Sequence, residues 1–502
     1  MIFTEHERDK IASKNYDLCI IGAGIMGLVI ANELKNAGIS VCVVESGNSQ
    51  NNLLTESAKT VQSEKLQIRT QSRERGLGGS SQTWGGLTGL FDEWDLDTHE
   101  HIDSSGWPIE YSELMEYVSR SASKYQFPKP EMFSDKTFLD TELLKGSKSL
   151  TGELFIAPTK PLRFGDVFKG LFQGELMDLV SGATVLKLST DKLSRSVNCA
   201  ELAFEPGESI RVWARYFVLA TGGIENPRIL LNSDELGNER DQVGRYFMNH
   251  PKGFSGRLDI SDSSAFTRHF IKNYGTYKKY VGITLSPEFR NNKKLLHPYI
   301  QLQPVYPWDE SKGFVFWMEM KKKEVRQNPP SFLELIRGLV LMVLYYLHIV
   351  TNLRVPIHSA RLLSYIDMAP QPENRIVLSN TSDLFGIPHA KLDAEIGELD
   401  LTSLSSVHAE LKDFLIKKKV GVLHSVDISD VSIDASHHMG ATRMGSDPNT
   451  SVVDRNLKLH FWDNVYIAGT SVLPTGGNAN PTLIAVALTV RLADHLKTRF
   501  VL

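Results

Sequence analysis

Cysteine is scarce in this sequence. Its 502 residues include 3 cysteines, and Cys19, Cys42 and Cys199 form no CxxC pair. This usage excludes a disulfide framework and a cysteine-ligated metal site, and we expect no bound metal. A reducing compartment fits three isolated thiols best.

The sequence also lacks an excess of charge of either sign. Lys and Arg number 55, Asp and Glu number 59, and the net charge is −4. Because nucleic-acid binding needs a basic field, we expect no nucleic-acid partner. Residues 1–17 are charged and lack the apolar core of a secretory signal, so we expect a cytoplasmic protein.

Long apolar runs are rare, and residues 332–350 are the exception. Glu334, Arg337 and His348 interrupt this run, which makes a transmembrane helix unfavourable. Three interpretations stay open: a helix in the protein's own core, an oligomer contact, or a helix on an anionic membrane surface near the basic residues 321–323.

A strand, a glycine-rich turn and a helix are present near the N-terminus. Tyr16 to Ile21 is an apolar run typical of a buried parallel strand, and "GAGIMG" follows it. The pattern predicts a helix from about Ile25 to Ala37, ended by Gly38, and a second strand at residues 40–45. These elements form a βαβ unit.

The glycine spacing in this unit predicts a dinucleotide site. Gly22 permits the tight turn, Gly24 lets the backbone approach a pyrophosphate, and Gly27 allows close packing of helix on strand. Glu45, at the end of the second strand, is placed to accept hydrogen bonds from a ribose. The motif alone is weak evidence, and its position between strand and helix supports it.

Two further glycine-rich stretches follow. Residues 76–89, "GLGGSSQTWGGLTG", have more glycine than a turn requires, which predicts backbone lying against a ligand. Trp84 at its centre argues against a solvated surface loop. A later strand ends in Thr221 and Gly222 before a helix, as a dinucleotide fold would have it.

The last hundred residues contain two polar stretches. "HHMGATRMGSDPNTSVVD" begins at His437, and "NVYIAGTSVLPTGGNANPTL" is a strand ending in Gly469 followed by a turn. The amphipathic spacing of residues 482–496 predicts a helix that begins just after Asn480 and Pro481. Together, strand, turn and helix would return the chain to the parallel sheet.

These motifs, with "ATGGIENPRILLNS" and "VGRYFMNHP", resemble the glucose–methanol–choline (GMC) oxidoreductases over nearly the whole chain. The likeness is greatest to the pyranose-oxidase-like and sugar dehydrogenase branch. It implies an α/β fold, with a Rossmann-type FAD-binding domain on a parallel sheet interleaved with an α+β substrate domain on a mainly antiparallel sheet. We expect the FAD domain at 1–90, 165–250 and 431–502, and the substrate domain at 91–164 and 251–430.

The resemblance also implies the catalytic residues. His437 falls on the family's catalytic histidine, where it would take the hydroxyl proton, and Asn480 falls on the second catalytic position. Its neighbour His438 is the rival for the role of base, although adjacent side chains point apart. His250 matches a family position near the cavity, where a structural role is at least as plausible.

FAD is the cofactor that the resemblance implies, and we expect it to be noncovalent. Pyranose oxidases attach their flavin through a histidine before the tryptophan of the glycine-rich loop, and Thr83 stands there in this sequence. The cofactor-binding residues expected from the family, besides those of the βαβ unit, are Gly79, Ser80, Ser81, Gly85, Val185, Thr221, Gly222, Gly469, Pro481 and Thr482.

The function implied is oxidation of an alcohol, most plausibly a sugar or glycoside hydroxyl, by hydride transfer to flavin N5. Oxygen, a quinone or a carrier protein would then take the electrons. Two alternatives share the pattern: a non-redox flavoprotein of the hydroxynitrile lyase type, and a membrane-associated electron-transfer dehydrogenase subunit that docks through residues 332–350.

Overall fold

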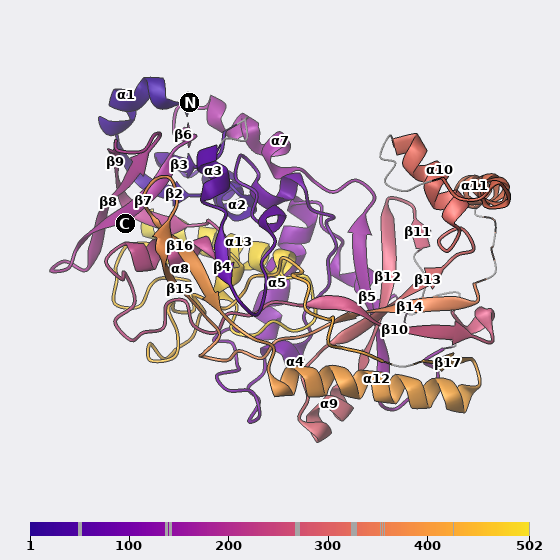
Figure 1. Ribbon diagram of the computed structural model, residues 1–502. Helices are drawn as coiled ribbons and strands as arrows, with labels where there is room; N and C mark the ends of the chain where they lie inside the picture. Colours follow the sequence, from indigo (N-terminus) through magenta and orange to yellow (C-terminus); the bar gives the residue numbers. More distant parts are fainter. Residues whose placement is uncertain are drawn as a thin grey trace.

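The computed structural model describes residues 1–48, 53–135, 139, 143–266, 272–322, 329–351, 353, 355, 357–424 and 426–500. Two sheets dominate it, one at each end of the molecule (Figure 1). Both ends of the chain lie beside the first sheet, so the N-terminal and C-terminal motifs meet there.

The first sheet is mainly parallel. It has eight strands among the described residues, and β2 and β3 at its centre pair in parallel from Leu18 and Val41 onward. Because these two strands are almost entirely apolar, both faces of the sheet must be covered by other elements. In spatial order the strands are β1 (Ile2–Phe3), β6 (Met177–Ser181), β3 (Val41–Glu45), β2 (Asn15–Ile21), β9 (Ile210–Leu219), β8 (Ser196–Ala203) and β7 (Thr184–Asp191), with β18 (Val465–Ile467) also on β9.

Helices from both ends of the chain pack on this sheet. α2 (Ile25–Leu34) lies against α13 (Thr482–Phe500), which also packs on α5 (Tyr111–Lys124). The sequence predicted that α2 would reach Ala37, but it ends at Leu34, whose carbonyl accepts a hydrogen bond from Ala37 N in a closing turn. The shorter helices are α1 (Arg8–Ala12), α3 (Leu53–Ser57), α4 (Glu93–Leu96), α7 (Phe164–Phe168), α8 (Glu225–Asn232) and α9 (Pro287–Lys293).

The second sheet is antiparallel, as expected for the middle of the chain. α12 (Glu398–Lys418) covers one face, where Leu411 and Leu415 pack with Ile300 and Leu362. The opposite face carries a row of aromatic rings. The strands, in order, are β11 (Lys272–Tyr274), β12 (Tyr277–Leu285), β13 (Tyr299–Val305), β14 (Ser359–Tyr365), β10 (Lys252–Ile260) and β17 (Gly421–Leu423), with β5 (Leu150–Pro158) also on β12.

A small third sheet joins distant segments beside the first one. β15 (Arg375–Ser382) pairs with β16 (Pro388–Asp393), and β16 pairs in parallel with β4 (Val61–Ser63). β15 also packs on α8. The domain boundaries expected from the sequence stay a prediction, but these pairings bring part of segment 251–430 against the parallel sheet.

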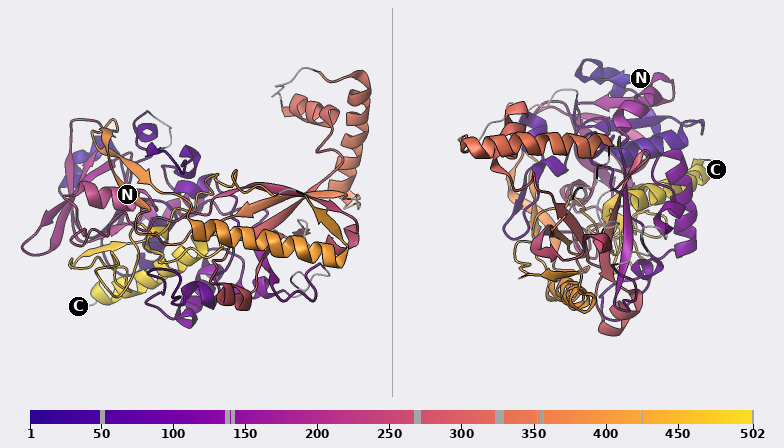
Figure 2. Two further views of the ribbon diagram at one scale, coloured as in Figure 1. Left: turned by 60° about the horizontal axis from the view of Figure 1, so that its bottom comes forward. Right: turned by 90° about the vertical axis from the view of Figure 1, so that its right-hand side faces the viewer.

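The apolar segment forms α11 (Phe332–Thr351), which pairs with α10 (Lys312–Lys322) in a helical hairpin. Figure 2 shows the hairpin standing away from the body at the far end of the antiparallel sheet. In α11 only Gly338 and Leu341 are buried, so one of the three interpretations left open, a helix in the protein's own core, is wrong. By length and composition α11 could cross a membrane.

Candidate functional site

The first turn after β2 has the close geometry that its glycines predict. Gly22 adopts φ 101°, a left-handed conformation that favours glycine, and Gly24 is the N-cap residue of α2. A Cβ on Gly27 would overlap the carbonyl oxygen of Gly22, so only glycine fits there. A Cβ on Gly24 would meet no atom of the described protein within 4 Å. The backbone at Gly24 is therefore open to a ligand.

Glu45, at the end of β3, is hydrogen-bonded to three glycine-containing turns. Its carboxylate accepts hydrogen bonds from the backbone N–H groups of Ala23 at 2.9 Å, Gly47 at 2.8 Å and Gly76 at 2.9 Å. The side chain also lines the cavity that opens above these turns. The contact of Glu45 with a ribose stays a prediction. Its hydrogen bonds to the three turns are a second role, which the motif did not indicate.

A deep cavity lies over the carboxyl ends of the parallel strands, where an open α/β sheet binds its ligands. Both ends of the chain contribute to its walls, through Gly24 and Thr482. Its other lining residues foreseen from the sequence are Gly22, Glu45, Gly79, Ser80, Val185, Thr221, Gly222 and Gly469. Because a Cβ on Gly222 would also meet no protein atom within 4 Å, the cavity offers a long cradle of open backbone. That cradle fits a dinucleotide.

Four of the predicted cofactor-binding residues do not line this cavity: Gly27, Ser81, Gly85 and Pro481. Gly27 packs α2 on β2, and Ser81 holds the glycine-rich loop together. The Ser81 hydroxyl donates to Gly78 O at 2.6 Å and accepts from Phe164 N at 3.1 Å. Trp84 Nε1 likewise donates to Leu162 O at 3.0 Å, so the loop is anchored on the side away from the cavity.

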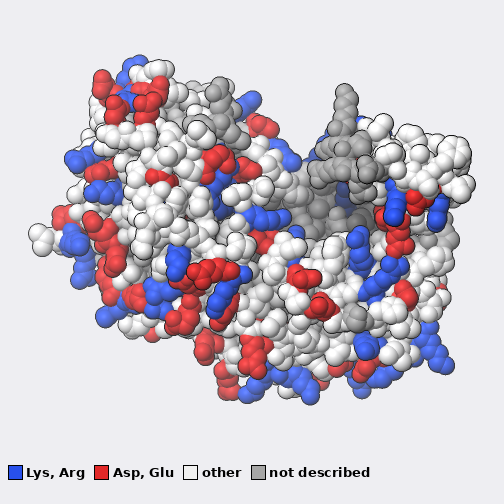
Figure 3. Space-filling model, viewed as in Figure 1, with Lys and Arg blue, Asp and Glu red and all other residues white. Residues whose placement is uncertain are grey.

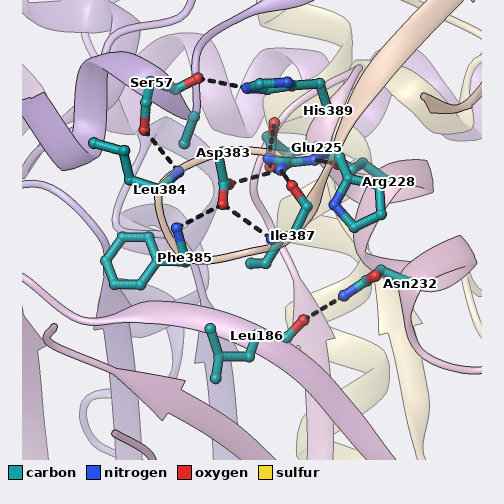
Figure 4. A network of polar contacts seen from close by, with 12 residues as sticks. Ser57, Leu186, Glu225, Arg228, Asn232, Asp383, Leu384, Phe385, Ile387 and His389 are labelled. Carbon is teal, nitrogen blue, oxygen red and sulfur yellow. Dashed lines mark hydrogen bonds and ion pairs between the residues drawn. The ribbon is translucent and has the colours of Figure 1, made fainter. Parts of the chain in front are cut away.

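One wall of the cavity is an ionic network that sequence reasoning missed. Arg228 Nη2 donates to Asp383 Oδ2 at 2.7 Å, and Arg228 Nε donates to Pro388 O at 2.7 Å (Figure 4). Burial opposes a charge on Glu225, but Arg228, Arg75 and Arg73 outweigh it and lower its pKa to about 2. The sequence could have shown the Glu225–Arg228 ion pair, because the two residues are three positions apart on α8. It could not have shown Asp383 as a further partner, because Asp383 lies far along the chain.

His437 and Asn480 meet beside the cavity. Asn480 Nδ2 donates to His437 Nε2 at 3.0 Å, although 43 positions separate them. On the other side of the ring, His437 Nδ1 lies 2.9 Å from His250 Nδ1. Burial lowers the pKa of His437 well below its usual value and that of His250 to about 4. Both imidazoles are therefore neutral at pH 7, the form in which a histidine accepts a proton.

The rival His438 has a different environment. Its Nε2 lies 3.3 Å from Asp434 Oδ1, and its ring stacks on Phe247. His438 lines the cavity, whereas His437 does not. The two neighbours thus point apart, and His437 is the one that contacts Asn480.

Comparison with known proteins agrees with this geometry. Residues 370–489, which include His437 and Asn480, match the GMC oxidoreductase family, and residues 15–73 match an FAD binding domain. The chain thus carries a GMC oxidoreductase domain and an FAD binding domain. It is an FAD-dependent enzyme whose FAD-binding and Rossmann-type features, predicted from the sequence, are confirmed.

Its relatives include sugar oxidoreductases. The chain is 26% identical to the fructose dehydrogenase large subunit of Gluconobacter japonicus, over 63% of this chain and 53% of that protein. It is 23% identical to the 6'''-hydroxyparomomycin C oxidase of Streptomyces lividus, over 97% of this chain and 92% of that protein. A fungal aryl-alcohol oxidase structure shares the fold, with TM-score 0.59 and 14% identity, over 97% of this chain and 99% of that one.

A buried ionic network holds the turn that carries Asn480. His297 lies with Nδ1 2.9 Å from Asp95 Oδ1 and Nε2 2.7 Å from Glu153 Oε1. Asn478 donates to the second oxygen of Glu153, and the Thr475 hydroxyl donates to Asp95 O at 2.6 Å. The network therefore connects the antiparallel sheet to the turn two residues before Asn480.

His297 is charged at neutral pH. Burial and Arg290 oppose the charge, but Glu153 and Asp95 outweigh them and raise the pKa of His297 to about 10. Because this value exceeds that of an exposed histidine, the stabilisation is complete below about pH 6.5 and is lost as the pH rises through about 10. The protein should thus lose stability in alkali through this residue.

A substitution tests this pH dependence. We expect His297→Gln to lower the free energy of unfolding at pH 7 by about 3–5 kcal/mol, as breaking a buried ion pair does. The difference between wild type and variant should shrink between pH 7 and 10, measured by urea unfolding. Exposed His424, which pairs with Asp259, offers the matched control His424→Gln, for which we expect little change. A difference for His297→Gln that is constant over this range would contradict the charge assignment.

Proposed function

We propose that this GMC oxidoreductase oxidises a hydroxyl group of a sugar or glycoside to a carbonyl, with His437 as the base. The observation that carries the proposal is the contact of His437 Nε2 with Asn480 Nδ2, 3.0 Å long, beside the cavity. When bound there, FAD supplies the acceptor for the hydride, at flavin N5. The side chains supply the proton chemistry and the orientation.

His437 and Asn480 suit a hydroxyl group. To accept the hydroxyl proton, His437 Nε2 needs the lone pair that Asn480 Nδ2 contacts here, so the substrate hydroxyl would replace Asn480 Nδ2 at this nitrogen, and burial keeps the ring uncharged beforehand. Asn480 Oδ1 is buried and has no hydrogen-bond partner among the described residues. A second hydroxyl of the substrate, next to the one that is oxidised, would satisfy this oxygen by donating to it and would aim the reacting carbon toward the flavin.

The aromatic face of the antiparallel sheet lies near the catalytic pair, and its rings are buried. Tyr299 stacks between Phe155, at a centroid distance of 4.3 Å, and Tyr365, at 4.4 Å. Lys252 lies over the ring of Tyr365, and its positive charge helps to lower the pKa of His437. This face of the sheet therefore adjoins the catalytic pair. The proposal of a sugar substrate rests on the relatives. Fructose and paromomycin derivatives are named for the relatives above.

The cofactor is held without a covalent bond in this proposal, because Thr83 stands where the related pyranose oxidases have their attaching histidine. The predicted contacts of Ser81, Gly85 and Pro481 become indirect, through the loop and helix that present the lining residues. We also place the enzyme in the cytoplasm, where Cys19, Cys42 and Cys199 would remain the buried free thiols seen here.

The test is an anaerobic absorbance scan of purified protein with a panel of pyranoses, glycosides and simple diols. We expect one sugar class to bleach the flavin bands, and acid precipitation to release the FAD into the supernatant. Readmitting air then separates an oxidase from a dehydrogenase that uses a quinone or carrier protein. Bleaching by diols alone would contradict the sugar assignment, and turnover without bleaching would point to lyase chemistry.

A further inference from the structure

The α10–α11 hairpin is an insertion between two neighbouring strands of the antiparallel sheet, β13 and β14. Its two helices pack through glycines, since a Cβ on Gly313 or Gly338 would overlap backbone atoms of the other helix. Trp308, Phe314 and Leu341 form the small core beneath them. One face of α11 is therefore fixed against α10, and its opposite face has no partner among the described residues.

This outer face of α11 is apolar over its whole length. At 3.6 residues per turn its side chains cover about 140° of the helix circumference. Phe332 is 76% exposed, Val343 62% and Val350 78%. The outer face consists of Phe332, Leu333, Ile336, Leu339, Val340, Val343, Tyr346, Leu347 and Val350.

The charged groups of the hairpin lie beside this face and not on it. Arg337 is exposed at one edge. At the other edge, exposed Lys321 of α10 donates to the hydroxyl of Tyr346. Glu334 lies on the inner side, where its carbonyl faces Gly313. Figure 3 shows the hairpin, at the upper right, as a largely uncharged surface with basic and acidic groups next to it. A helix on the water-exposed surface of a protein instead turns its charged face to the solvent and its apolar face to the core.

We propose that the outer face of α11 binds the surface of a lipid bilayer, with the helix axis in the membrane plane. Apolar side chains would enter the acyl region, while Lys321 and Arg337 remain at the level of the headgroups. Spanning does not fit, because α10 has 11 residues. Such a helix covers about 16 Å, half of the hydrocarbon thickness of about 30 Å, and could not bring the chain back.

A lipid surface matches the outer face better than a second copy of the chain does. Protein interfaces carry roughly one hydrogen bond per 100–200 Å². The outer face offers only the Tyr346 hydroxyl, which already binds Lys321. Acyl chains require no such partner, and cations at both edges are what phospholipid headgroups accept.

The experiment is vesicle flotation of the flavin-loaded full chain. Vesicles of phosphatidylcholine with roughly one part in four phosphatidylglycerol carry wild type upward in the gradient, and V340E/V343E lowers the bound fraction at least roughly tenfold. The matched control is Leu193→Glu, at a residue that is 98% exposed in the β7–β8 connection, and it floats like wild type. Unchanged flavin absorbance verifies that each variant folds.

Three outcomes would overturn the proposal. Wild type with its flavin intact could remain in the soluble fraction, which excludes the bilayer as the partner. V340E/V343E could float as well as wild type, which moves the binding surface elsewhere. Sedimentation velocity without vesicles could show a dimer that V340E/V343E dissociates while wild type fails to float, which assigns the outer face to a second copy of the chain.

Discussion

Replacing His437 by alanine is expected to slow flavin reduction by roughly three orders of magnitude, while the protein is still recovered yellow. General base catalysis contributes about 10²–10⁴-fold, and the positioning of Asn480 against the ring is lost as well. The cofactor should remain bound, because His437 does not line the cavity. Loss of rate without loss of flavin is the signature of a base that acts beside the cofactor and not on its binding.

Anaerobic stopped-flow absorbance measures this rate directly. His438→Ala separates the two neighbours: His438 lines the cavity and contacts Asp434, so its loss should reduce the flavin content first. His424→Ala is the neutral control, at an exposed histidine of the antiparallel sheet. If His437→Ala reduces its flavin at the wild-type rate, or only His438→Ala loses the reaction, the base is wrongly assigned.

Replacing Gly27 by alanine is expected to reduce the flavin content to a small fraction and to destabilise the protein itself. The added Cβ would overlap the carbonyl oxygen of Gly22, a backbone atom that cannot move without opening the turn. Overpacking costs typically about 1–3 kcal/mol, and here the helix that faces the cofactor must also shift. We expect a lower Tm for the protein without cofactor and weaker FAD binding together.

Gly24→Ala should separate these two effects. Its Cβ meets no protein atom within 4 Å but enters the cavity, so the Tm without cofactor should stay near that of wild type while FAD binding weakens. Exposed Gly170, whose Cβ would also meet nothing within 4 Å, gives the control Gly170→Ala. Flavin content per chain and thermal unfolding of the protein without FAD are the measurements. Normal flavin content in Gly24→Ala would contradict the location of the cofactor.

Local sequence patterns predicted the part of the site that depends on turns. The strand before Gly22 and the helix after it are adjacent in the chain, and a close turn admits few residues, so the spacing of the glycines was informative. The resemblance to the family added His437 and Asn480. The structure brings these two side chains within hydrogen-bond distance. The sequence could not show this contact, because it forms only when the C-terminal segment folds back onto the parallel sheet.

Contacts between distant segments carried no local signal. His297 meets Asp95 and Glu153 across 202 and 144 positions, and each of these residues alone resembles an ordinary charged residue. Arg228 meets Asp383 in the same way, through the turn between β15 and β16. For α11 the composition predicted an apolar helix, but the sequence did not show which elements the helix packs against. An apolar helix is equally compatible with a core and with an exposed face until its neighbours are known.

The most direct test of the account is anaerobic flavin reduction with a sugar that carries deuterium at the oxidised carbon. Hydride transfer in the cavity beside His437 predicts that the flavin bands bleach once per bound cofactor and that deuterium slows the bleaching. If product forms while the flavin stays fully oxidised and deuterium changes nothing, the hydroxyl group is not oxidised by the flavin, and the account of this site is contradicted.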